Sequence, residues 1–596
     1  MASTTFVQGR WNRNDVLPGH EGSEYDKIVA ELKNRVAQFE ARRAQLSPDI
    51  TPEDLVELLH EYEATKILNR RLNGYASLWF AEDTQSAAAL TFQRQTGQMI
   101  TELSNRTLFF PLWWKALDDE TAARLLPYTG DYRYFLENER MFKTYTLAER
   151  EEQIINLKDS NGMAGLITVY DMLSNRLSFR LNVDGAERKL TRGELQGYFR
   201  DPSPAVRATA YQELLARFAE QGAVLAQIYS SRVQDWAAEQ IRLRHFASPI
   251  SVRNLANDVP DVAVQTLIEV CRANAPVFQD YFRKKAGWLG IPSGQFSRTD
   301  IYAPLAEANK TFEYGDAVDM VLESYESFSP RFADLARRVY AEQHVDAEVR
   351  PGKRSGGFCM SVVPKLTPYV HLNYAGTAKD VSTMAHEFGH AIHFLLAGDH
   401  STLTFHPALP LAETASLFGE TMMTDHLLAV EQDPAVRRDL LAGRLDDTYG
   451  NVMRQAYFTL FEQEAHALFA QGKSTDDLCA AYLKNLREQF GPAIPVGDEF
   501  KWEWVSIHHF FHVPFYTYAY SFGNLLALAL YKEYLANGQA FIPRYVKILA
   551  YGGAASPTEI LREAGIDITS AAFWQGGFDL VKTWVAELET LPAPSH

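Results

Sequence analysis

The stretch Met384-Ala385-His386-Glu387-Phe388-Gly389-His390 carries the pattern H-E-x-x-H. Residues four apart lie on one face of an α-helix, so His386 and His390 can aim their ring nitrogens at one point. Glu387 lies about 100° around the helix axis, which suits a base better than a third ligand. The pattern therefore predicts a helix that binds a metal ion and carries a carboxylate beside it.

The motif alone does not establish a metal site, because a surface helix with solvated His and Glu side chains can have the same H-E-x-x-H sequence. A third protein ligand is therefore needed. His393 lies one turn beyond His390, but three histidines along one straight helix cannot converge on a tetrahedral ion. We interpret His393 as a packing residue or as a hydrogen-bond partner of a ligand. The metzincin pattern would require glycine in place of His393 and histidine in place of Leu396. We therefore expect the third ligand from a following helix.

The segment Pro407–Glu420 begins with prolines suited to a helix N-terminus and continues with helix-forming residues. A loop through Gly398–Ser401 would let this helix return against the first one, so that Glu413 faces the histidines. Two neutral imidazoles and one carboxylate would then hold one Zn²⁺ per chain, with a net charge of about +1. Glu420, two turns further on, could accept a hydrogen bond from a ligand histidine, or it could be a solvated helix residue.

This set of residues predicts metal-assisted hydrolysis of an amide bond. Zinc held by three protein ligands keeps a fourth position for water and lowers the pKa of that water to about 7. Glu387 would act as general base, accepting a proton from this zinc-activated water and passing it to the departing amine. Co²⁺ or Mn²⁺ could occupy the same nitrogen and oxygen ligands.

Three motifs resemble one protein family. H-E-F-G-H-x-x-H followed by A-E-T-A-S resembles the zinc site of the thimet oligopeptidase and oligoendopeptidase F family of metallopeptidases. Pro351–Phe358 is similar to the glycine-rich segment of oligoendopeptidase F members, and His509–Tyr520 to their histidine- and tyrosine-rich segment. The motifs span residues from about 350 to 525, and the resemblance before residue 200 rests on length and helical character. It implies a zinc-dependent oligoendopeptidase that cleaves internal bonds of short unstructured peptides.

The resemblance also implies that one histidine and one tyrosine of the segment His509–Tyr520 hydrogen-bond the oxyanion of the tetrahedral intermediate. Donors aimed at developing negative charge are among the largest contributions to catalysis. We assign these roles to His509 and Tyr518. The remaining candidates are His508, His512, Tyr516 and Tyr520, and the alternative is an aromatic core helix with paired hydroxyls.

Substrate binding has a candidate in Thr367–Tyr374, a short alternating run of β-branched and aromatic residues. We expect an edge strand here that pairs with an extended peptide, because Pro364 and Pro368 fit an edge and not a central strand. An ordinary buried strand is the alternative. Lys353 or Arg354 could bind a peptide carboxylate or backbone.

Hydrophobic periodicity predicts a mainly α fold. Helices are expected over Tyr25–Leu46, Glu53–Asn69, 205–240, 261–287 and 314–345, and a strand over Leu177–Val183. The resemblance adds a two-lobed helical ellipsoid with a deep central channel and a small β-sheet next to the zinc-binding helix. The prolines and serine of Asp201–Pro204 suggest a boundary between an N-terminal helical region, 1–200, and a catalytic region, 201–596. We expect the N-terminal region to form part of the channel wall.

The amino-acid composition limits the classes of molecule that this chain is expected to bind. A formal charge of −17 and a pI near 5.5 argue against nucleic acid and anionic membranes as partners. The family resemblance implies short peptides as substrates. The N-terminus lacks the apolar run of a secretory signal and no window offers 18 apolar residues, so we expect a cytoplasmic protein. Cys271, Cys359 and Cys479 form no C-x-x-C pair and are expected to be reduced.

Two other functions remain open. A zinc carboxypeptidase or dipeptidase on a related helical scaffold would need a site for the terminal carboxylate of its substrate. A peptide-binding protein with a closed zinc site would bind peptides without turnover. Glu387 argues against the second, because a metal site without catalysis needs no base beside it.

Overall fold

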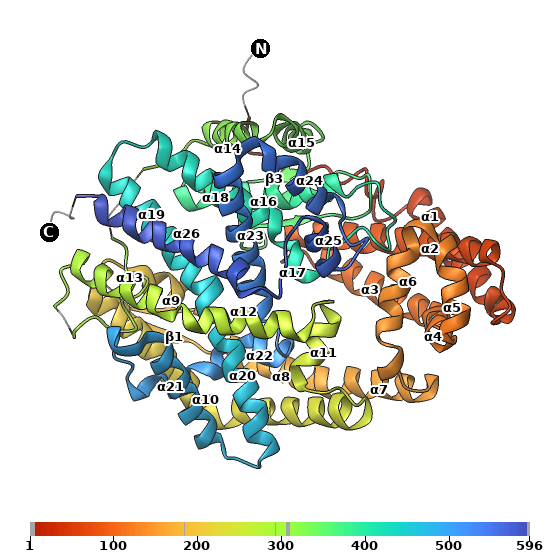
Figure 1. Cartoon of the computed structure of the whole chain (residues 1–596), viewed down its shortest axis with the longest axis horizontal. Coiled ribbons are helices and arrows are strands. Elements are labelled where there is room, and N and C mark those ends of the chain that lie inside the picture. The colour runs from red at the N-terminus through yellow and green to blue at the C-terminus, as the bar shows by residue number, and fades with distance from the viewer. Residues whose placement is uncertain (1–5, 184, 293, 306–309, 593–596) are drawn as a thin grey trace. The chain divides into compact units, whose positions relative to one another are not determined.

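The computed structural model describes residues 6–183, 185–292, 294–305 and 310–592 (Figure 1). These residues form helices and two small sheets, which confirms the mainly α prediction. Backbone contacts divide the chain into two compact units, neither of them one continuous segment. Unit 1 comprises Met1–Thr144, Lys310–Ala429 and Leu530–Ile566, and unit 2 comprises Tyr145–Asn309, Val430–Ala529 and Asp567–His596. The expected boundary at 200/201 falls inside unit 2.

Unit 1 holds the helix of the H-E-x-x-H motif and the helices of the chain's first part. Its helices are α1 (Ser23–Ala41), α2 (Pro52–Glu82), α3 (Ala87–Thr107), α4 (Phe109–Ala116), α5 (Asp119–Leu125), α6 (Arg133–Met141), α14 (Tyr314–Phe328), α15 (Pro330–Ala341), α16 (Ala378–Leu396), α17 (Leu409–Ala412), α18 (Thr414–Val430), α24 (Ile542–Ala550) and α25 (Pro557–Glu563). Short 3₁₀ turns η1 (Arg42–Gln45), η2 (Leu126–Tyr128), η3 (Gly130–Tyr132) and η10 (Gly538–Phe541) join some of them. Helices α1, α2 and α3 pack side by side.

Unit 2 is built around the long helix α10. Its elements are α7 (Glu149–Asn161), α8 (Met163–Asn175), β1 (Phe179–Val183), β2 (Ala186–Leu190), α9 (Arg192–Gly197), η5 (Tyr198–Arg200), α10 (Pro204–Trp236), η6 (Ala237–Leu243), α11 (Pro249–Ala256), α12 (Asp261–Ala273), α13 (Ala275–Trp288), α19 (Pro434–Thr448), η7 (Tyr449–Met453), α20 (Arg454–Ala470), α21 (Thr475–Phe490), η8 (Gly491–Ala493), η9 (Asp498–Ser506), α22 (His508–His512) and α26 (Ala571–Thr590). Helix α23 (Tyr518–Asn537) crosses from unit 2 to unit 1, and η4 (Lys143–Tyr145) crosses the other boundary.

Several expected helices are interrupted where the sequence carries proline. The helix expected over 261–287 is broken at Asn274, and the one over 314–345 at Ser329. Pro276 and Pro330 occupy the first turns of the helices that follow, where a missing N–H group costs nothing. The strand expected at Leu177–Val183 is confirmed as β1, which pairs antiparallel with β2.

A three-stranded sheet in unit 1 lies against α16. It contains β3 (Val345–Asp346), β5 (Tyr369–His371) and β4 (Phe358–Met360), in the order β3-β5-β4. Strand β5 pairs parallel with β3 and antiparallel with β4. The expectation of an edge strand over Thr367–Tyr374 is therefore wrong, because its paired residues lie in the centre of the sheet. The prolines do not forbid this position, since Pro368 precedes the first paired residue.

The sheet is anchored in the main apolar core of the N-terminal helices. Tyr369 and Val362 are buried with Trp11 and with residues of α1, α2 and α3, while Phe358 and Met360 pack against the same cluster. Gly74 of α2 lets this contact form, because a Cβ atom there would lie 2.9 Å from the methyl groups of Val362. Among the residues described here, no helix is both long and apolar enough to span a membrane.

Candidate metal centre

Helix α16 begins at a well-formed cap. Thr377 Oγ1 accepts a hydrogen bond from Asp380 N at 3.1 Å, and the Asp380 carboxylate accepts one from Thr377 N at 2.9 Å. This reciprocal pairing satisfies two N–H groups that the first turn leaves free. The helix then continues to Leu396, so both histidines of the motif lie on regular helix, as the spacing predicts.

Glycines bring α18 close to the histidines. A Cβ atom at Gly389 would lie 2.5 Å from the Ala415 carbonyl oxygen and 2.6 Å from Ser416 Cα. On the facing helix, a Cβ atom at Gly419 would lie 3.1 Å from the Ala385 carbonyl oxygen. Only glycine at these two positions permits such an approach, since any other residue carries the clashing carbon.

Glu413 meets both histidines. It lies at the junction of α17 and α18, with φ −86° and ψ 0°. Its Oε2 atom is 3.3 Å from His386 Nε2 and 3.3 Å from His390 Nε2. The potential ligand atoms of the three residues all lie within 4.8 Å of one another. The convergence expected from the sequence is thus present in unit 1.

These residues fit a zinc ion. Ligand atoms placed tetrahedrally around Zn²⁺ at bond lengths near 2.05 Å lie about 3.3 Å apart, which is the separation seen from Glu413 to each imidazole. Without a proton or a cation between them, the lone pairs of an imidazole nitrogen and a carboxylate oxygen would repel each other. The donor set of two nitrogens and one oxygen is typical of catalytic zinc sites.

Two side chains orient these candidate ligands. His386 Nδ1 lies 3.1 Å from Glu420 Oε2, so a proton on Nδ1 leaves Nε2 free to face Glu413. Burial opposes a charge on the His386 imidazole, but hydrogen bonds with Glu413 and Glu420 raise its pKa well above the ordinary value. Ser416 Oγ donates to Glu413 Oε2 at 2.7 Å and fixes the carboxylate one turn away. The serine of the A-E-T-A-S stretch is the sequence signal for this contact.

Glu387 is buried beside the candidate ligands and does not take part in the three-residue cluster. Burial raises the pKa of its carboxyl group, while the imidazoles of His386 and His390 act in the opposite direction. A Cβ atom at Gly357 would lie 2.9 Å from Glu387 Oε1. The glycine-rich segment before β4 therefore passes directly over this carboxylate. A carboxylate with a raised pKa suits a group that must accept and return a proton.

The remaining histidine of the helix is a core residue. His393 is buried, and burial lowers its pKa to about 3, so its ring is neutral. Its hydrogen-bond partner is the backbone of Ala412, next to Glu413. This agrees with the prediction that His393 is not a ligand.

Tyr325 forms a hydrogen bond with the backbone of α16, and this contact was not predicted from the sequence. Its hydroxyl donates to the Ala385 carbonyl oxygen at 2.5 Å, one residue before His386. Its ring occupies the space that Gly419 leaves open. Nothing in the local sequence signals this role, because Tyr325 lies on α14, far from the motif along the chain.

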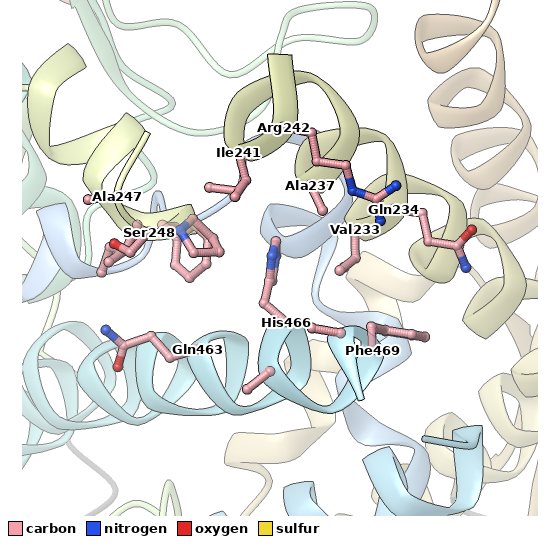
Figure 2. Close-up of a pocket in the computed structure, with 15 residues that line it drawn as sticks. Val233, Gln234, Ala237, Ile241, Arg242, Ala247, Ser248, Gln463, His466 and Phe469 are labelled. Carbon is pink, nitrogen blue, oxygen red and sulfur yellow. The ribbon is translucent and has the colours of Figure 1, made fainter. Parts of the chain in front are cut away.

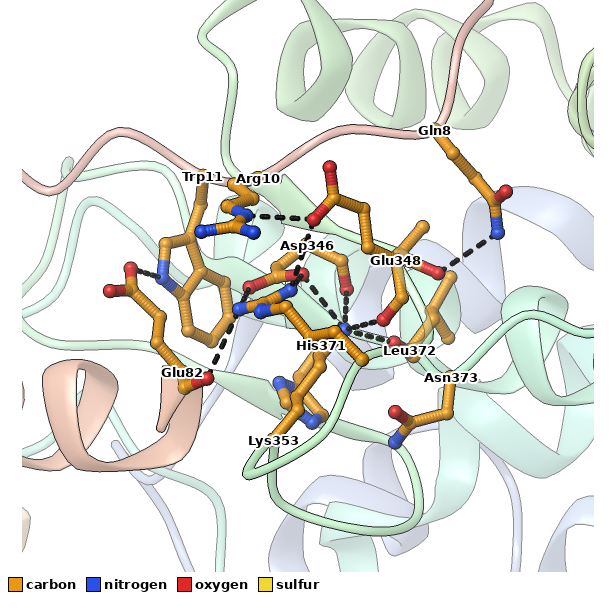
Figure 3. Close-up of polar contacts among 12 residues, drawn as sticks. Gln8, Arg10, Trp11, Glu82, Asp346, Glu348, Lys353, His371, Leu372 and Asn373 are labelled. Atoms are coloured by element: carbon orange, nitrogen blue, oxygen red, sulfur yellow. Dashed lines mark hydrogen bonds and ion pairs between the residues drawn. The ribbon is translucent and has the colours of Figure 1, made fainter. Parts of the chain in front are cut away.

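A charged network fixes the segment that precedes β4 (Figure 3). Lys353 Nζ is fully buried, pairs with Asp346 Oδ1 at 2.8 Å and donates to the carbonyl oxygens of Glu348 and Leu372. Arg350 forms two further hydrogen bonds with the Asp346 carboxylate, both 2.7 Å. The prediction that Lys353 could bind a peptide is therefore wrong, because its buried ammonium group pairs with Asp346 and with backbone carbonyl groups of the protein itself.

The loop that carries these residues is also held by β5 and its continuation. His371 Nε2 lies 2.9 Å from the Arg354 carbonyl oxygen, and Asn373 Nδ2 donates to the carbonyl oxygens of Arg354 and Gly356. Burial lowers the pKa of His371 to about 4, so a neutral ring donates to Arg354. These contacts position Gly357 over Glu387.

His509 and Tyr518, which were predicted to stabilise the oxyanion, both lie in unit 2, and their surroundings differ from each other. Tyr518 is fully buried, and its hydroxyl accepts a hydrogen bond from Asn257 Nδ2 at 2.8 Å. The half-buried His509 ring instead stacks parallel to Tyr516, with centroids 5.6 Å apart, and its Nε2 lies 3.3 Å from the Tyr520 hydroxyl. Burial lowers the pKa of His509 to about 4. The structure therefore groups His509 with Tyr516 and Tyr520 and not with Tyr518.

Two other clusters of possible ligands occur in the described part of the chain. One contains Asp15, Glu342 and His344, and the other contains Asp159, Asp235 and Glu239. His344 already contacts the Thr367 carbonyl oxygen and Asp15, and Glu239 pairs with Arg244. Neither cluster has two histidines and a base beside them.

Comparisons with known proteins point to one family. Residues 198–580 match the model of Peptidase family M3. The chain is 25% identical over 552 residues to Group B oligopeptidase PepB of Streptococcus agalactiae, covering 90% of each protein. It is 23% identical to oligopeptidase PepF of Bacillus subtilis, covering 99% of this chain and 88% of that one. The crystal structure of oligoendopeptidase-F from Enterococcus faecium superimposes with a TM-score of 0.73 at 21% identity, covering 95% and 98% of the chains, which shows a shared fold.

Proposed function

Because this chain belongs to Peptidase family M3, we propose that it is a zinc-dependent oligoendopeptidase that hydrolyses internal bonds of short peptides. The chain is a peptide-bond hydrolase by membership of that family. The convergence of His386, His390 and Glu413 beside Glu387 carries the finer proposal. The names of its relatives, oligopeptidase and oligoendopeptidase, support short peptides as substrates.

In this proposal His386, His390 and Glu413 hold the metal. A bound Zn²⁺ would supply Lewis acidity toward water and toward the carbonyl oxygen of the scissile bond. Glu387 accepts a proton from the attacking water and delivers it to the leaving amine nitrogen. Its position supports this role, because Glu387 is buried next to the proposed ligands and takes no part in their cluster.

The geometry favours β4 as the strand that pairs with substrate, in place of Thr367–Tyr374. Strand β4 is at the edge of the sheet, and the residue before it, Gly357, lies against Glu387. An extended peptide hydrogen-bonded to Phe358–Met360 would run beside the general base. The absence of a side chain at Gly357 lets this backbone lie directly against Glu387 and Thr383.

Stabilisation of the oxyanion by His509 and a tyrosine stays a proposal from the family resemblance. The contacts within unit 2 favour Tyr520 or Tyr516 over Tyr518 for the tyrosine role, because the Tyr518 hydroxyl is buried and bound to Asn257. A neutral His509 can donate one N–H group to a developing negative charge. The cytoplasmic location likewise stays a prediction.

Replacement of the general base tests the mechanism. We expect Glu387→Gln to retain zinc and thermal stability and to lose most hydrolysis of a quenched peptide, since the amide cannot accept the proton. Glu24→Gln, on the exposed surface of α1, is the matched control. Near-normal turnover by a zinc-loaded Glu387→Gln enzyme would refute the assigned role.

Metal analysis and product analysis test the other two parts. We expect His390→Ala to lose zinc, measured as zinc per chain, whereas His245→Ala should not. A peptide blocked at both ends should be cut internally, and mass spectrometry of the products would show it. Release of only terminal residues from an unblocked peptide, with no cleavage of the blocked one, would indicate an exopeptidase instead.

A further inference from the structure

Unit 2 contains a cavity that the proposed chemistry does not use. Its volume is about 600 Å³, within the range of small-molecule sites. Figure 2 shows it between α20 below and the end of α10 with η6 above, and the His466 ring rises from α20 toward η6. The π-helical turn η6 departs from regular helix along this wall. Such departures are often found at functional sites.

The walls of the cavity are mainly apolar. Val233, Ala237 and Ile241 line it from α10 and η6, Ala467 and Phe469 line it from α20, and Phe515 adds an aromatic ring to the lining. Apolar walls of this kind favour a ligand with a hydrocarbon or aromatic body, because burying that body removes apolar surface from water.

One wall is fixed before any ligand arrives. Phe515 has a positive φ of 57°, which is unfavourable for a phenylalanine, and its N–H group donates to Glu462 Oε1 at 2.9 Å. Burial raises the pKa of Glu462 to about 8. The Phe515 ring packs against His466, with centroids 4.7 Å apart. A preformed wall lowers the entropic cost of binding.

The charges around the cavity are unequal at its two ends. Arg242 lines it, is exposed, and makes no hydrogen bond or ion pair with the residues that the structure describes. Burial lowers the pKa of His466 to about 3, so this ring is neutral near pH 7. A smaller, adjoining cavity of about 370 Å³ shares Ser248, Ile250 and Gln463 and is lined by Asp261, Glu269 and Arg272. Arg272 pairs with Glu488, so Asp261 and Glu269 leave this end negative. An anion is therefore attracted to the Arg242 end and repelled at the other.

We propose that this cavity binds an apolar carboxylic acid, with the apolar body against Phe515 and Ile241 and the carboxylate paired with Arg242. A free aliphatic acid and the C-terminus of a peptide that ends in an apolar residue share this chemistry. Arginine suits the role, since its planar guanidinium can donate two parallel hydrogen bonds to a carboxylate.

Calorimetric titration of the full chain tests the proposal with two matched pairs of probes. The first pair is octanoate and octanamide. The second is N-acetyl-leucyl-phenylalanine and its C-terminal amide, titrated into the Glu387→Gln protein to prevent hydrolysis. We expect saturable binding of at least one acid, about tenfold or more tighter than its amide. Binding of octanoate alone would assign the site to free acids, and binding of the peptide acid alone would assign it to peptide C-termini.

Two substitutions locate the binding site. Arg242→Gln should weaken binding of the acid by about tenfold and leave binding of the amide unchanged. Ala467→Phe fills the cavity from an exposed helix position and should abolish binding of both. Arg176→Gln and Ala205→Phe, at exposed positions of unit 2, are the controls, and thermal unfolding checks that all variants are folded.

Three results would overturn the proposal. They are the absence of saturable binding by either acid, equal binding of acid and amide, and acid binding that survives Ala467→Phe.

Discussion

Gly389 lies so close to Ala415 that a single methyl group on the glycine would come within 2.5 Å of the alanine carbonyl oxygen. This contact sits between the two histidines of the motif and the glutamate that completes the site. Because Glu413 is two residues before Ala415, the distance between the helices there sets the distance from carboxylate to imidazole. The glycine within H-E-F-G-H thus has a geometric role in bringing together the residues of the proposed metal centre.

Gly389→Ala is expected to separate α16 from α18 and to weaken metal binding. Overpacking of this kind typically costs about 1–3 kcal/mol, so the variant should also unfold at lower denaturant concentration. Zinc content after dialysis and urea unfolding measure the two effects. Gly97→Ala is the matched control, because a Cβ atom at Gly97 on α3 would meet nothing within 4 Å. Full zinc content and unchanged stability of Gly389→Ala would contradict the role given to this contact.

Glu420→Gln tests the orientation of His386. The carboxylate accepts from His386 Nδ1 at 3.1 Å, and its loss should leave the ligand ring less fixed and less basic. We expect zinc affinity to fall by roughly 10- to 100-fold, as is usual when a partner of a metal ligand is removed. Competition with a chelator measures the affinity. Glu24→Gln should bind zinc as the parent does, and equal affinities of the two variants would remove Glu420 from the site.

Lys353→Met is expected to destabilise unit 1. The substitution leaves the fully buried Asp346 with one cationic partner fewer, and breaking a buried pair costs about 3–5 kcal/mol. Arg350 still pairs with Asp346, so the loss should be near the lower figure. Urea unfolding measures it. Arg354→Gln is the neighbouring control, since the Arg354 side chain stacks on Phe358 and forms no ion pair with the described residues.

His400 makes stability depend on pH. Its Nδ1 lies 2.7 Å from Asp131 Oδ1 and its Nε2 2.9 Å from the Ala550 carbonyl oxygen, so both nitrogens face acceptors. The hydrogen bond with Asp131 raises the pKa of His400. A raised pKa in the folded state stabilises the protein below the ordinary histidine pKa of about 6.5. This stabilisation is lost as the pH rises through the raised value.

The difference in Tm between the parent and His400→Gln should accordingly be larger at pH 6 than at pH 9. Thermal unfolding at both values measures it. His245→Asn, at an exposed position with positive φ, is the control for the loss of a histidine. A difference that grows with pH would contradict the assignment.

Tyr520→Phe and Tyr518→Phe separate the two candidate tyrosines. If Tyr520 donates to the oxyanion, its loss should lower kcat by about 100- to 1000-fold with little change in stability. Tyr518→Phe should chiefly cost stability, about 1–3 kcal/mol, because Asn257 loses a buried partner. Peptide hydrolysis and urea unfolding on each variant give the comparison. A large fall in kcat for Tyr518→Phe alone, with normal stability, would return the role to Tyr518.

The local sequence was informative about features that depend on a single helix or strand. The spacing of His386 and His390 implies a shared helix face, and Pro407–Glu420 carries helix signals, so a ligand from the return helix could be expected. Helix ends were placed less accurately. Pro276 and Pro330 lie in the first turns of new helices. The hydrophobic pattern continues across each proline, so the sequence alone did not show that one helix ends and another begins there.

Tertiary structure decided everything that depends on partners distant along the chain. The sequence by itself determined a mainly helical chain and a histidine pair with a neighbouring glutamate on one helix, and it predicted Glu413 as the residue that joins them. It did not determine that β5 is central and β4 the edge, because strand order depends on pairing with Val345–Asp346. Nor did it determine that Tyr518 is buried against Asn257 while Tyr520 approaches His509. Periodicity reports which face of one element is buried, and only packing reports what that face meets.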